Sequence, residues 1–263
     1  IATFQQGVSP SPTYAGCTDA WLDPWSPTAN YWQDNILYCY CGRMGSSGYR
    51  FSLLRFDITI IPIYAEIISA TLSLQKPYWT AQPYCCALYE VLQPWYERVV
   101  SWEYRVYEPW RNPRWEEGGC AGVSERGRLV AEQVAPKAPG WVRWDISVLA
   151  RRWVAQPERN HGLLLAAPEA EEKVRFTSAE GTPHNRPKLS IAYRLPEADV
   201  LPQVAIQSPR AWETVRGATT IQVQAADDHG LERVEFYVGE GQTFLGADAA
   251  PPFELAWDTT EWA

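Results

Sequence analysis

Apolar and polar residues alternate along most of this chain, and a two-residue period is typical of β-strands that turn one face toward a core. Proline and glycine, with 21 and 17 residues, interrupt the alternation at short intervals and mark turns. The first part of the chain contains about eight such stretches, which suits a jelly-roll-like β-sandwich whose two packed sheets close one core. They lie at residues 35–41, 51–58, 67–75, 84–92, 140–145, 162–167, 173–178 and 187–194.

One segment has a helical period instead. Between residues 146 and 155 the apolar side chains recur at the three- and four-residue spacing of an amphipathic helix. Asp145 or Ser147 is available to cap the first turn. We therefore expect one short helix packed against a sheet. Its apolar face comprises Ile146, Leu149, Ala150, Trp153 and Val154.

A second alternating series follows the segment 195–199, which has the proline and acidic content of a linker. Four strand-like runs after residue 203 predict an immunoglobulin-like (Ig-like) sandwich. The 67 residues from 197 to 263 are fewer than the roughly 100 that a seven-strand domain takes. The sequence thus predicts an all-β chain: a jelly-roll-like β-sandwich with one short helix at 1–196 and a truncated Ig-like β-sandwich at 197–263.

The charge is divided unevenly between these two parts. Residues 197–263 hold 12 Asp and Glu against three Arg, whereas residues 1–196 hold 19 acidic and 20 basic side chains. This asymmetry supports two domains. Neither part has the clustered basic face that a phosphate backbone requires, so we expect no nucleic-acid partner.

We also expect no insertion into a membrane, because no stretch approaches the roughly 20 apolar residues of a membrane helix. The sequence begins at Ile1 without a basic start and an apolar block. Any signal peptide is therefore expected to be already removed or to lie upstream.

Six cysteines stand in the first half of the chain, none with the C-x-x-C spacing of a zinc site. Their even number in a Trp-rich, Met-poor β protein favours disulfides and export to an oxidising compartment, with free buried thiols as the alternative. Alternation places Cys39 and Cys41 on one face of a strand but Cys85 and Cys86 on opposite faces, so the first two cannot both bridge straight across to the second pair. The disulfide candidates are Cys17, Cys39, Cys41, Cys85, Cys86 and Cys120.

Several segments resemble, in order, blocks of the DNRLRE-domain family of secreted bacterial and archaeal proteins. FSLLRFDI at 51–58 and AEIISATLSL at 65–74 carry the resemblance most clearly. Together the matching segments cover about residues 1–195, although the hexapeptide that names the family is absent. The later matching blocks are WYERVVSW at 95–102, WDIS at 144–147, NHGLLL at 160–165, FTSAE at 176–180 and RPKL at 186–189.

This resemblance implies a jelly-roll-like sandwich in cell-surface and secreted multidomain proteins, some of which bind acidic polysaccharide such as alginate. Residues 202–257, with VEFYV at 234–238 and WDTT at 257–260, resemble bacterial Ig-like repeats that serve as spacers or stalks. In such repeats two further strands follow the last segment, whereas this sequence ends at Ala263. Both resemblances imply non-catalytic modules.

Catalytic motifs are absent from the sequence: it has no G-x-S-x-G, H-E-x-x-H or phosphate-cradling loop. His161, His184 and His229 lie in predicted turns or loops, where a solvated role is the usual one. Pairs such as Asp57 and Glu66 are fortuitous among 31 carboxylates. We expect a protein that is not an enzyme and needs no cofactor.

Aromatic side chains in predicted loops are the candidates for ligand binding. Trp102 and Trp153 match core segments, whereas flat rings in Pro- and Asp-rich loops, including Trp79, Trp110 and Trp115, are able to stack on sugars. The alternatives are that loop rings clamp connections onto the sandwich or are buried in a subunit contact. The carbohydrate-binding candidates are Trp21, Trp25, Tyr31 and Trp32.

Three carboxylates in the same region, Asp19, Asp23 and Asp34, offer oxygen ligands for a structural calcium ion. Their spacing is not that of an EF-hand loop, and a solvated surface is the alternative.

An incomplete second sandwich exposes backbone polar groups beside an apolar groove, which is costly in water. Either another chain donates a strand, linking subunits head to tail into a fibre, or the polypeptide continues beyond residue 263. The groove candidates are Val223, Phe236 and Trp257.

The sequence therefore favours a non-catalytic, secreted or cell-surface structural module: a stalk, an adhesin or an extracellular fibre subunit. The alternative function is a carbohydrate-binding module for an anionic or neutral polysaccharide, acting through the loop tryptophans.

Overall fold

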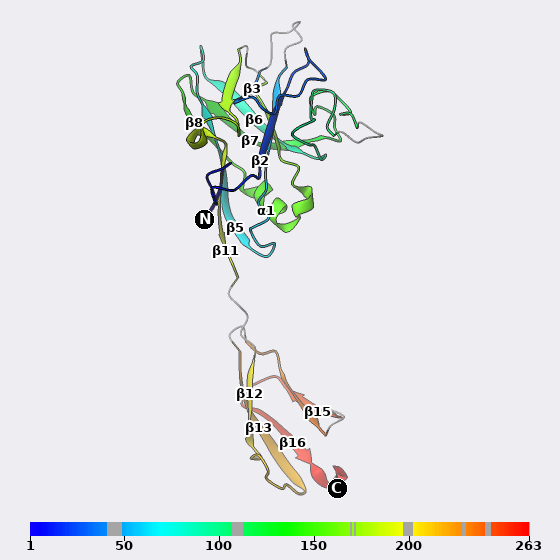
Figure 1. Ribbon diagram of the computed structural model, residues 1–263. Helices are drawn as coiled ribbons and strands as arrows, with labels where there is room; N and C mark the ends of the chain where they lie inside the picture. The colour runs from blue at the N-terminus through cyan, green and yellow to red at the C-terminus, as the bar shows by residue number, and fades with distance from the viewer. Residues whose placement is uncertain are drawn as a thin grey trace. The chain divides into compact units, whose positions relative to one another are not determined.

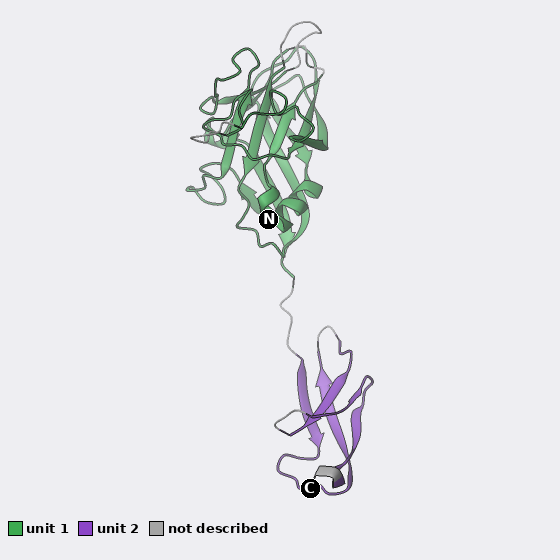
Figure 2. Cartoon of the chain, turned by 90° about the vertical axis from the view of Figure 1, so that its right-hand side faces the viewer, with its two compact units in different colours: residues 1–196 green, residues 197–263 purple. Residues whose placement is uncertain are grey.

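The computed structural model describes residues 1–40, 49–106, 113–168, 170, 172–196, 202–227, 230–239 and 243–262. The chain divides into two compact units, Ile1–Pro196 and Glu197–Ala263, shown in separate colours in Figure 2. Four earlier expectations fall on residues outside the described ranges: those for Cys41, for Trp110, for His229 and for most of the 195–199 linker. Within the described part of the chain, no helix combines the length and hydropathy of a membrane span.

The first unit is an antiparallel β-sandwich with one α-helix (Figure 1). One sheet has the order β1-β11-β5-β8, another has the order β2-β4-β9-β6-β7, and β10 pairs with β3 in a two-stranded sheet. The strands are β1 (Ala2–Phe4), β2 (Cys17–Leu22), β3 (Ile36–Cys39), β4 (Phe51–Phe56), β5 (Glu66–Lys76), β6 (Tyr84–Val91), β7 (Arg126–Ala135), β8 (Gly140–Asp145), β9 (Leu163–Ala166), β10 (Val174–Thr177) and β11 (Lys188–Arg194). The predicted all-β class with one short helix is confirmed.

The helix α1 (Ser147–Ala155) lies alongside β5, and the short 3₁₀ turns η1 (Pro157–Arg159) and η2 (Pro183–Asn185) follow later in the chain (Figure 1). Asp145 accepts hydrogen bonds from the backbone N–H of Ser147 at 2.8 Å and from its hydroxyl at 2.5 Å. The first of these bonds satisfies the backbone N–H of Ser147, which has no acceptor within the helix. The face that includes Trp153 is buried in the main core, as its spacing predicts.

Two strands of the five-stranded sheet, called the central sheet from here on, lack the alternation of apolar and polar residues from which strands were predicted. In β2, the stretch CTDAWL is buried on both faces, so its apolar and polar residues do not alternate. In β7, the charged stretch RGRLVAEQVA forms an edge strand with most of its side chains partly or fully exposed. The structure therefore corrects one expectation: Trp21 lies in strand β2, not in a loop.

The central five-stranded sheet has a core on each face. Leu54, Leu163 and Leu165 belong to the main core between the sheets. Leu53 and Leu164, which point the other way, pack in a second cluster. Residues from the connection between β6 and β7 cover that outer face, namely Trp95, Val100, Trp115 and Cys120.

The second unit is a smaller sandwich of two sheets, β12-β13-β16 and β14-β15. Its core is formed by Ile221, Val223, Phe236 and Phe253. The elements are β12 (Gln203–Ser208), β13 (Ala218–Ala226), β14 (Val234–Val238), β15 (Thr243–Asp248), β16 (Phe253–Asp258) and the 3₁₀ turn η3 (Thr259–Trp262).

Gly162, just before β9, combines a left-handed backbone conformation with a close approach to another part of the backbone. Its φ is +85°, and a Cβ added there would lie 2.3 Å from the carbonyl oxygen of Leu54. We predict that Gly162→Ala lowers the free energy of unfolding by at least about 2 kcal/mol, because left-handed strain and a backbone clash add together. Urea unfolding followed by tryptophan fluorescence measures this.

Gly7→Ala is the matched control. Gly7 also has a positive φ, +63°, but the nearest atom to an added Cβ is the tip of the Arg186 side chain at 3.0 Å. Only the conformational cost of about 1 kcal/mol is expected there. Equal losses in the two variants would contradict the role assigned to the Leu54 carbonyl.

Candidate functional site

Trp21 is the centre of an aromatic group in the first unit. Its ring stacks on Tyr31 with centroids 3.8 Å apart and contacts Tyr38 at 4.8 Å. The indole N–H donates to a carboxylate oxygen of Asp34 at 2.7 Å, and the Arg50 guanidinium lies 5.6 Å from the ring centroid. Only 7% of Trp21 is exposed, so its main role in this arrangement is packing.

The other three predicted sugar-binding residues differ in exposure. Trp25 is 63% exposed and is free to meet a ligand. Tyr31 is half-buried by its stack on Trp21. Trp32 is half-buried against the outer core cluster, with the Arg98 guanidinium 5.1 Å from its ring centroid. The structure thus brings Trp21 and Tyr31 together and presents Trp25 to solvent.

Tyr78 and Trp79 form a second group of exposed rings, of which the sequence analysis had identified only Trp79. Trp79 is 72% and Tyr78 is 48% exposed. The Arg175 guanidinium lies 4.9 Å from the Tyr78 ring centroid, and Arg175 pairs directly with Tyr38 across β10 and β3. This cross-strand pairing links the Tyr78 ring to the Trp21 group, and only the tertiary structure reveals it.

Trp115, also placed in a predicted loop, has the clamping role instead. It is 5% exposed, and its indole N–H donates to the carbonyl oxygen of Ser101 at 3.0 Å. Trp95 does the same within the outer cluster, donating to the carbonyl oxygen of His161 at 2.8 Å. Both rings hold the long β6–β7 connection against the sheet.

Three carboxyl groups meet beside β2. Asp19 is 1% exposed, and its Oδ2 accepts the backbone N–H of Ala179 at 2.7 Å. The backbone N–H of Asp19 donates to Glu97 Oε1 at 3.0 Å. The Glu180 carboxyl lies beside Asp19, and its Oε2 is buried with no hydrogen-bond partner among the described residues.

Burial controls the protonation of this cluster. It raises the pKa of Asp19 well above its usual range, and the neighbouring charge of Glu180 raises it further. Burial, followed by the charge of Glu97, raises the pKa of Glu180 to about 7. Two neighbouring carboxyl groups that are removed from water favour a state in which at least one proton is retained between them.

The aspartates considered for calcium have separate partners. Asp23 pairs with Arg50 at 3.1 Å, and Asp34 accepts the Trp21 indole N–H at 2.7 Å. Asp19 is engaged with Ala179. In the ranges that the structure covers, no group of three or more His, Cys, Asp or Glu side chains is placed to hold a metal ion.

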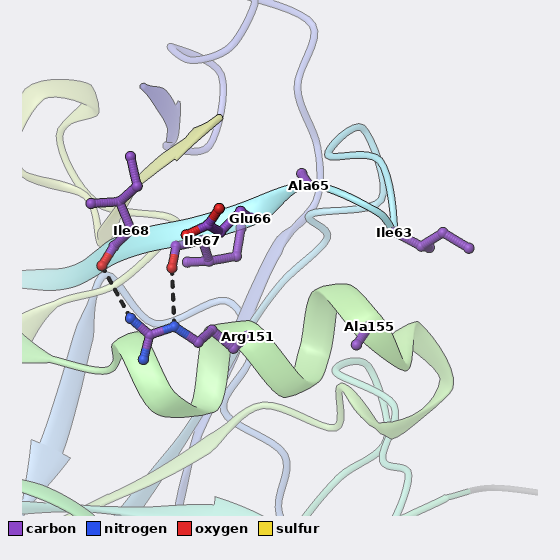
Figure 3. A pocket seen from close by; sticks show the side chains of 7 residues that line it. All are labelled: Ile63, Ala65, Glu66, Ile67, Ile68, Arg151 and Ala155. Atoms are coloured by element: carbon purple, nitrogen blue, oxygen red, sulfur yellow. Dashed lines mark hydrogen bonds between the residues drawn. The ribbon is translucent and has the colours of Figure 1, made fainter. Parts of the chain in front are cut away.

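A pocket of about 430 Å³ lies between α1 and the start of β5 (Figure 3). Strand β8 pairs only with Thr71–Lys76 of β5, so the preceding carbonyls lack a strand partner on that side. Arg151 takes its place, donating Nε to the carbonyl of Ile67 at 3.0 Å and Nη2 to that of Ile68 at 3.2 Å (Figure 3). The Arg151 guanidinium of this pocket therefore completes the hydrogen bonding of the sheet edge and is not a reactive group.

In the second unit, the predicted groove residues are enclosed. Val223 and Phe236 are 9% and 5% exposed, because the β14-β15 sheet covers β13, and Trp257 is half-buried. The open apolar surface lies on β12 instead, where Val204 and Ile206 are 67% and 64% exposed. They are paired with Ala225 and Val223, so they share the core-facing side of their sheet.

The cysteines lie mostly in the core. Cys17, Cys39, Cys86 and Cys120 are buried thiols, and the structure joins none of these four in a disulfide. Cys17, Cys39 and Cys86 belong to the main core and Cys120 to the outer cluster. Cys85 is half-buried on β6.

Residues 202–263 match the family described as Bacterial Ig domain. Domains of this family are typically extracellular or cell-surface modules and are generally non-enzymatic. The match bears out the Ig-like part of the sequence interpretation, whereas no DNRLRE match is found for the first unit. No curated protein matches the chain.

The carboxyl cluster generates a pH prediction. Glu180 has an ordinary pKa of 4.5 and a folded-state pKa of about 7, so the folded protein binds its proton more tightly than the unfolded chain. The resulting stabilisation is complete below the unfolded pKa and is lost as the pH rises through the folded pKa. Asp19 shifts in the same direction. We expect the free energy of unfolding, measured with urea between about pH 5 and 8, to contain a component that falls with rising pH.

Glu180→Gln isolates this component. Burial lowers the pKa of His161, which contributes a stability change of opposite sign over part of the range, so the readout is the difference between wild type and variant. The advantage of the wild type over the variant should shrink as the pH rises through about 7. A constant or growing difference would show that Glu180 is not the titrating group.

Proposed function

We propose that this chain is a non-catalytic structural module of a secreted or cell-surface protein, acting as a stalk, an adhesin or a subunit of an extracellular fibre. The observation that carries the proposal is the Bacterial Ig domain match over residues 202–263, which coincides with a compact unit that has its own core. Supporting it, two tryptophans outside the strands of the first unit, Trp95 and Trp115, hold a long connection on the sheet.

Assembly through the second unit is the specific form that we favour. Among the described residues β14 has β15 as its one strand neighbour, and β15 contacts β16. The unpaired edge of β14 therefore lies on the side of β12, where Val204 and Ile206 are exposed on the core-facing side. A strand from another copy, added to β14, would pair this edge and cover both side chains.

This assembly predicts concentration-dependent oligomers. Val204→Glu combined with Ile206→Glu should abolish them, because the charges would face the added strand, and both positions are exposed enough to leave the unit folded. Sedimentation velocity measures the association, and electron microscopy shows whether the oligomers are filaments. Ala205→Glu, on the opposite side of the same strand, is the matched control and should still assemble.

A wild-type protein that remains a 29.8 kDa monomer at every concentration would contradict strand addition from another copy. Assembly that survives the double substitution would place the contact elsewhere on the molecule.

Polysaccharide binding is the second candidate function, and the exposed aromatic groups of the first unit favour it. Trp25 and Trp79 present flat rings to solvent, while the Arg175 guanidinium lies over the Tyr78 ring. Aromatic faces stack on sugar rings, and guanidinium groups pair with carboxylates. This combination suits an acidic polysaccharide.

Trp25→Ala tests this candidate on a glycan array that includes uronic-acid polymers. We expect binding to fall at least about tenfold with unfolding changed by less than about 0.5 kcal/mol, because the ring is exposed. Trp21→Ala is the contrasting variant: it should lower stability by about 3 kcal/mol, since the ring is buried. Saturable binding that is unchanged in both Trp25→Ala and Trp79→Ala would exclude these rings as the platform.

A further inference from the structure

Two cysteines from different sheets lie together in the main core of the first unit. Cys39 is the last residue of β3, and Cys86 is in the first half of β6. Both have no exposed surface, and both belong to the same hydrophobic cluster. They are thus separated along the sequence but packed in one dry region.

The two side chains are neighbours in this core. Burial raises the pKa of the Cys39 thiol, and the adjacent Cys86 thiol raises it further, while Cys86 Sγ lies 3.8 Å from the carbonyl oxygen of Tyr84. The backbone carbonyl of Cys86 accepts the indole N–H of Trp144 at 3.0 Å, which fixes the strand at this point. A thiol is a weak hydrogen-bond donor, so two thiols facing each other in a core gain little from remaining reduced.

We propose that Cys39 and Cys86 form a disulfide that crosses the core and ties β3 to β6 when the protein folds in an oxidising compartment. The inference rests on the proposed export only for the source of the oxidant. It selects one pair from the six cysteines and leaves Cys120, in the separate outer cluster, outside this bond.

The chemistry is a thiol–disulfide exchange with an oxidised dithiol or a small-molecule disulfide. Each of the two cysteines gives up its thiol proton and one electron, an S–S bond forms between them, and the donor disulfide is reduced to two thiols. Burial raises the pKa of the Cys39 thiol, so the reactive thiolate is scarce once the core is closed. The bond is therefore expected to form during folding and to resist reduction afterwards.

The location gives this bond a structural consequence. β3 and β10 form a two-stranded sheet, and such sheets are marginal without further support. The noncovalent ties of β3 to the central sheet include the bond from the Ser52 hydroxyl to the Tyr38 carbonyl at 2.8 Å. A disulfide to β6 would fasten this small sheet, which carries Tyr38 and Arg175 of the aromatic groups.

Counting thiols tests the pairing. The full chain is refolded in a glutathione redox buffer, denatured, and alkylated, and the mass of the intact protein gives the number of free thiols. Cys39→Ala and Cys86→Ala should each raise that number by one relative to wild type, although each removes a cysteine, because each releases the other partner. The double variant should return to the wild-type number. A fall in either single variant, or a changed number in the double variant, would overturn the proposal.

A second measurement uses only the wild type, in case a core substitution prevents folding. Peptide mapping without reduction should find a peptide containing Cys39 joined to one containing Cys86, with fragmentation identifying the bonded sulfur atoms. Cys39 found as a free thiol, or joined to another cysteine, would contradict the proposal. Since the redox buffer supplies the oxidant, a failure of the pairing is distinguishable from a failure of the proposed export, which is read from the protein isolated from its natural host.

Discussion

The burial of the central sheet on both faces is the constraint on which the rest of the first unit depends. Strand β9 has four consecutive buried residues, because one side packs in the main core and the other under the β6–β7 connection. An apolar outer face left in water would be unfavourable at about 25 cal/mol per Å². The long connection is therefore part of the fold, and this explains why it carries buried tryptophans such as Trp95 and Trp115.

The same burial accounts for the polar features of the unit. Asp19 is on the inner side of β2, so it is removed from water, and burial together with the neighbouring Glu180 charge raises its pKa. Lys76, 1% exposed at the end of β5, donates instead to the carbonyls of Tyr78 at 2.6 Å and Lys137 at 2.9 Å. Buried polar groups such as these need hydrogen-bond partners, and here the partners are backbone groups in the turns and loops between strands. The exposed rings of Tyr78 and Trp79 are thus presented by a turn that is itself held in place.

In the second unit, by contrast, part of the apolar surface on the core-facing side of a sheet stays exposed. Its two sheets are unequal, so the core encloses Val223 and Phe236 but leaves Val204 and Ile206 uncovered on the core-facing side. Residues 202–263, which match a bacterial Ig domain, therefore hold the apolar surface through which we propose contact with another chain. The first unit, with its larger core and exposed aromatic groups, is where recognition of a ligand is proposed.

The sequence by itself determined the fold class, the helix and most strands of the first unit, because a period of two or 3.6 residues, or a short apolar run, is a local property. It also identified the Ig-like unit through its alternating runs. It could not place β2, whose residues are buried on both faces, or show that Trp21 is packed while Trp25 is exposed. Those outcomes depend on which segments cover which face. Likewise, only the tertiary structure brought Cys39 to Cys86 and Asp19 to Glu180, since contacts between distant strands follow from sheet packing and are not encoded in any local pattern.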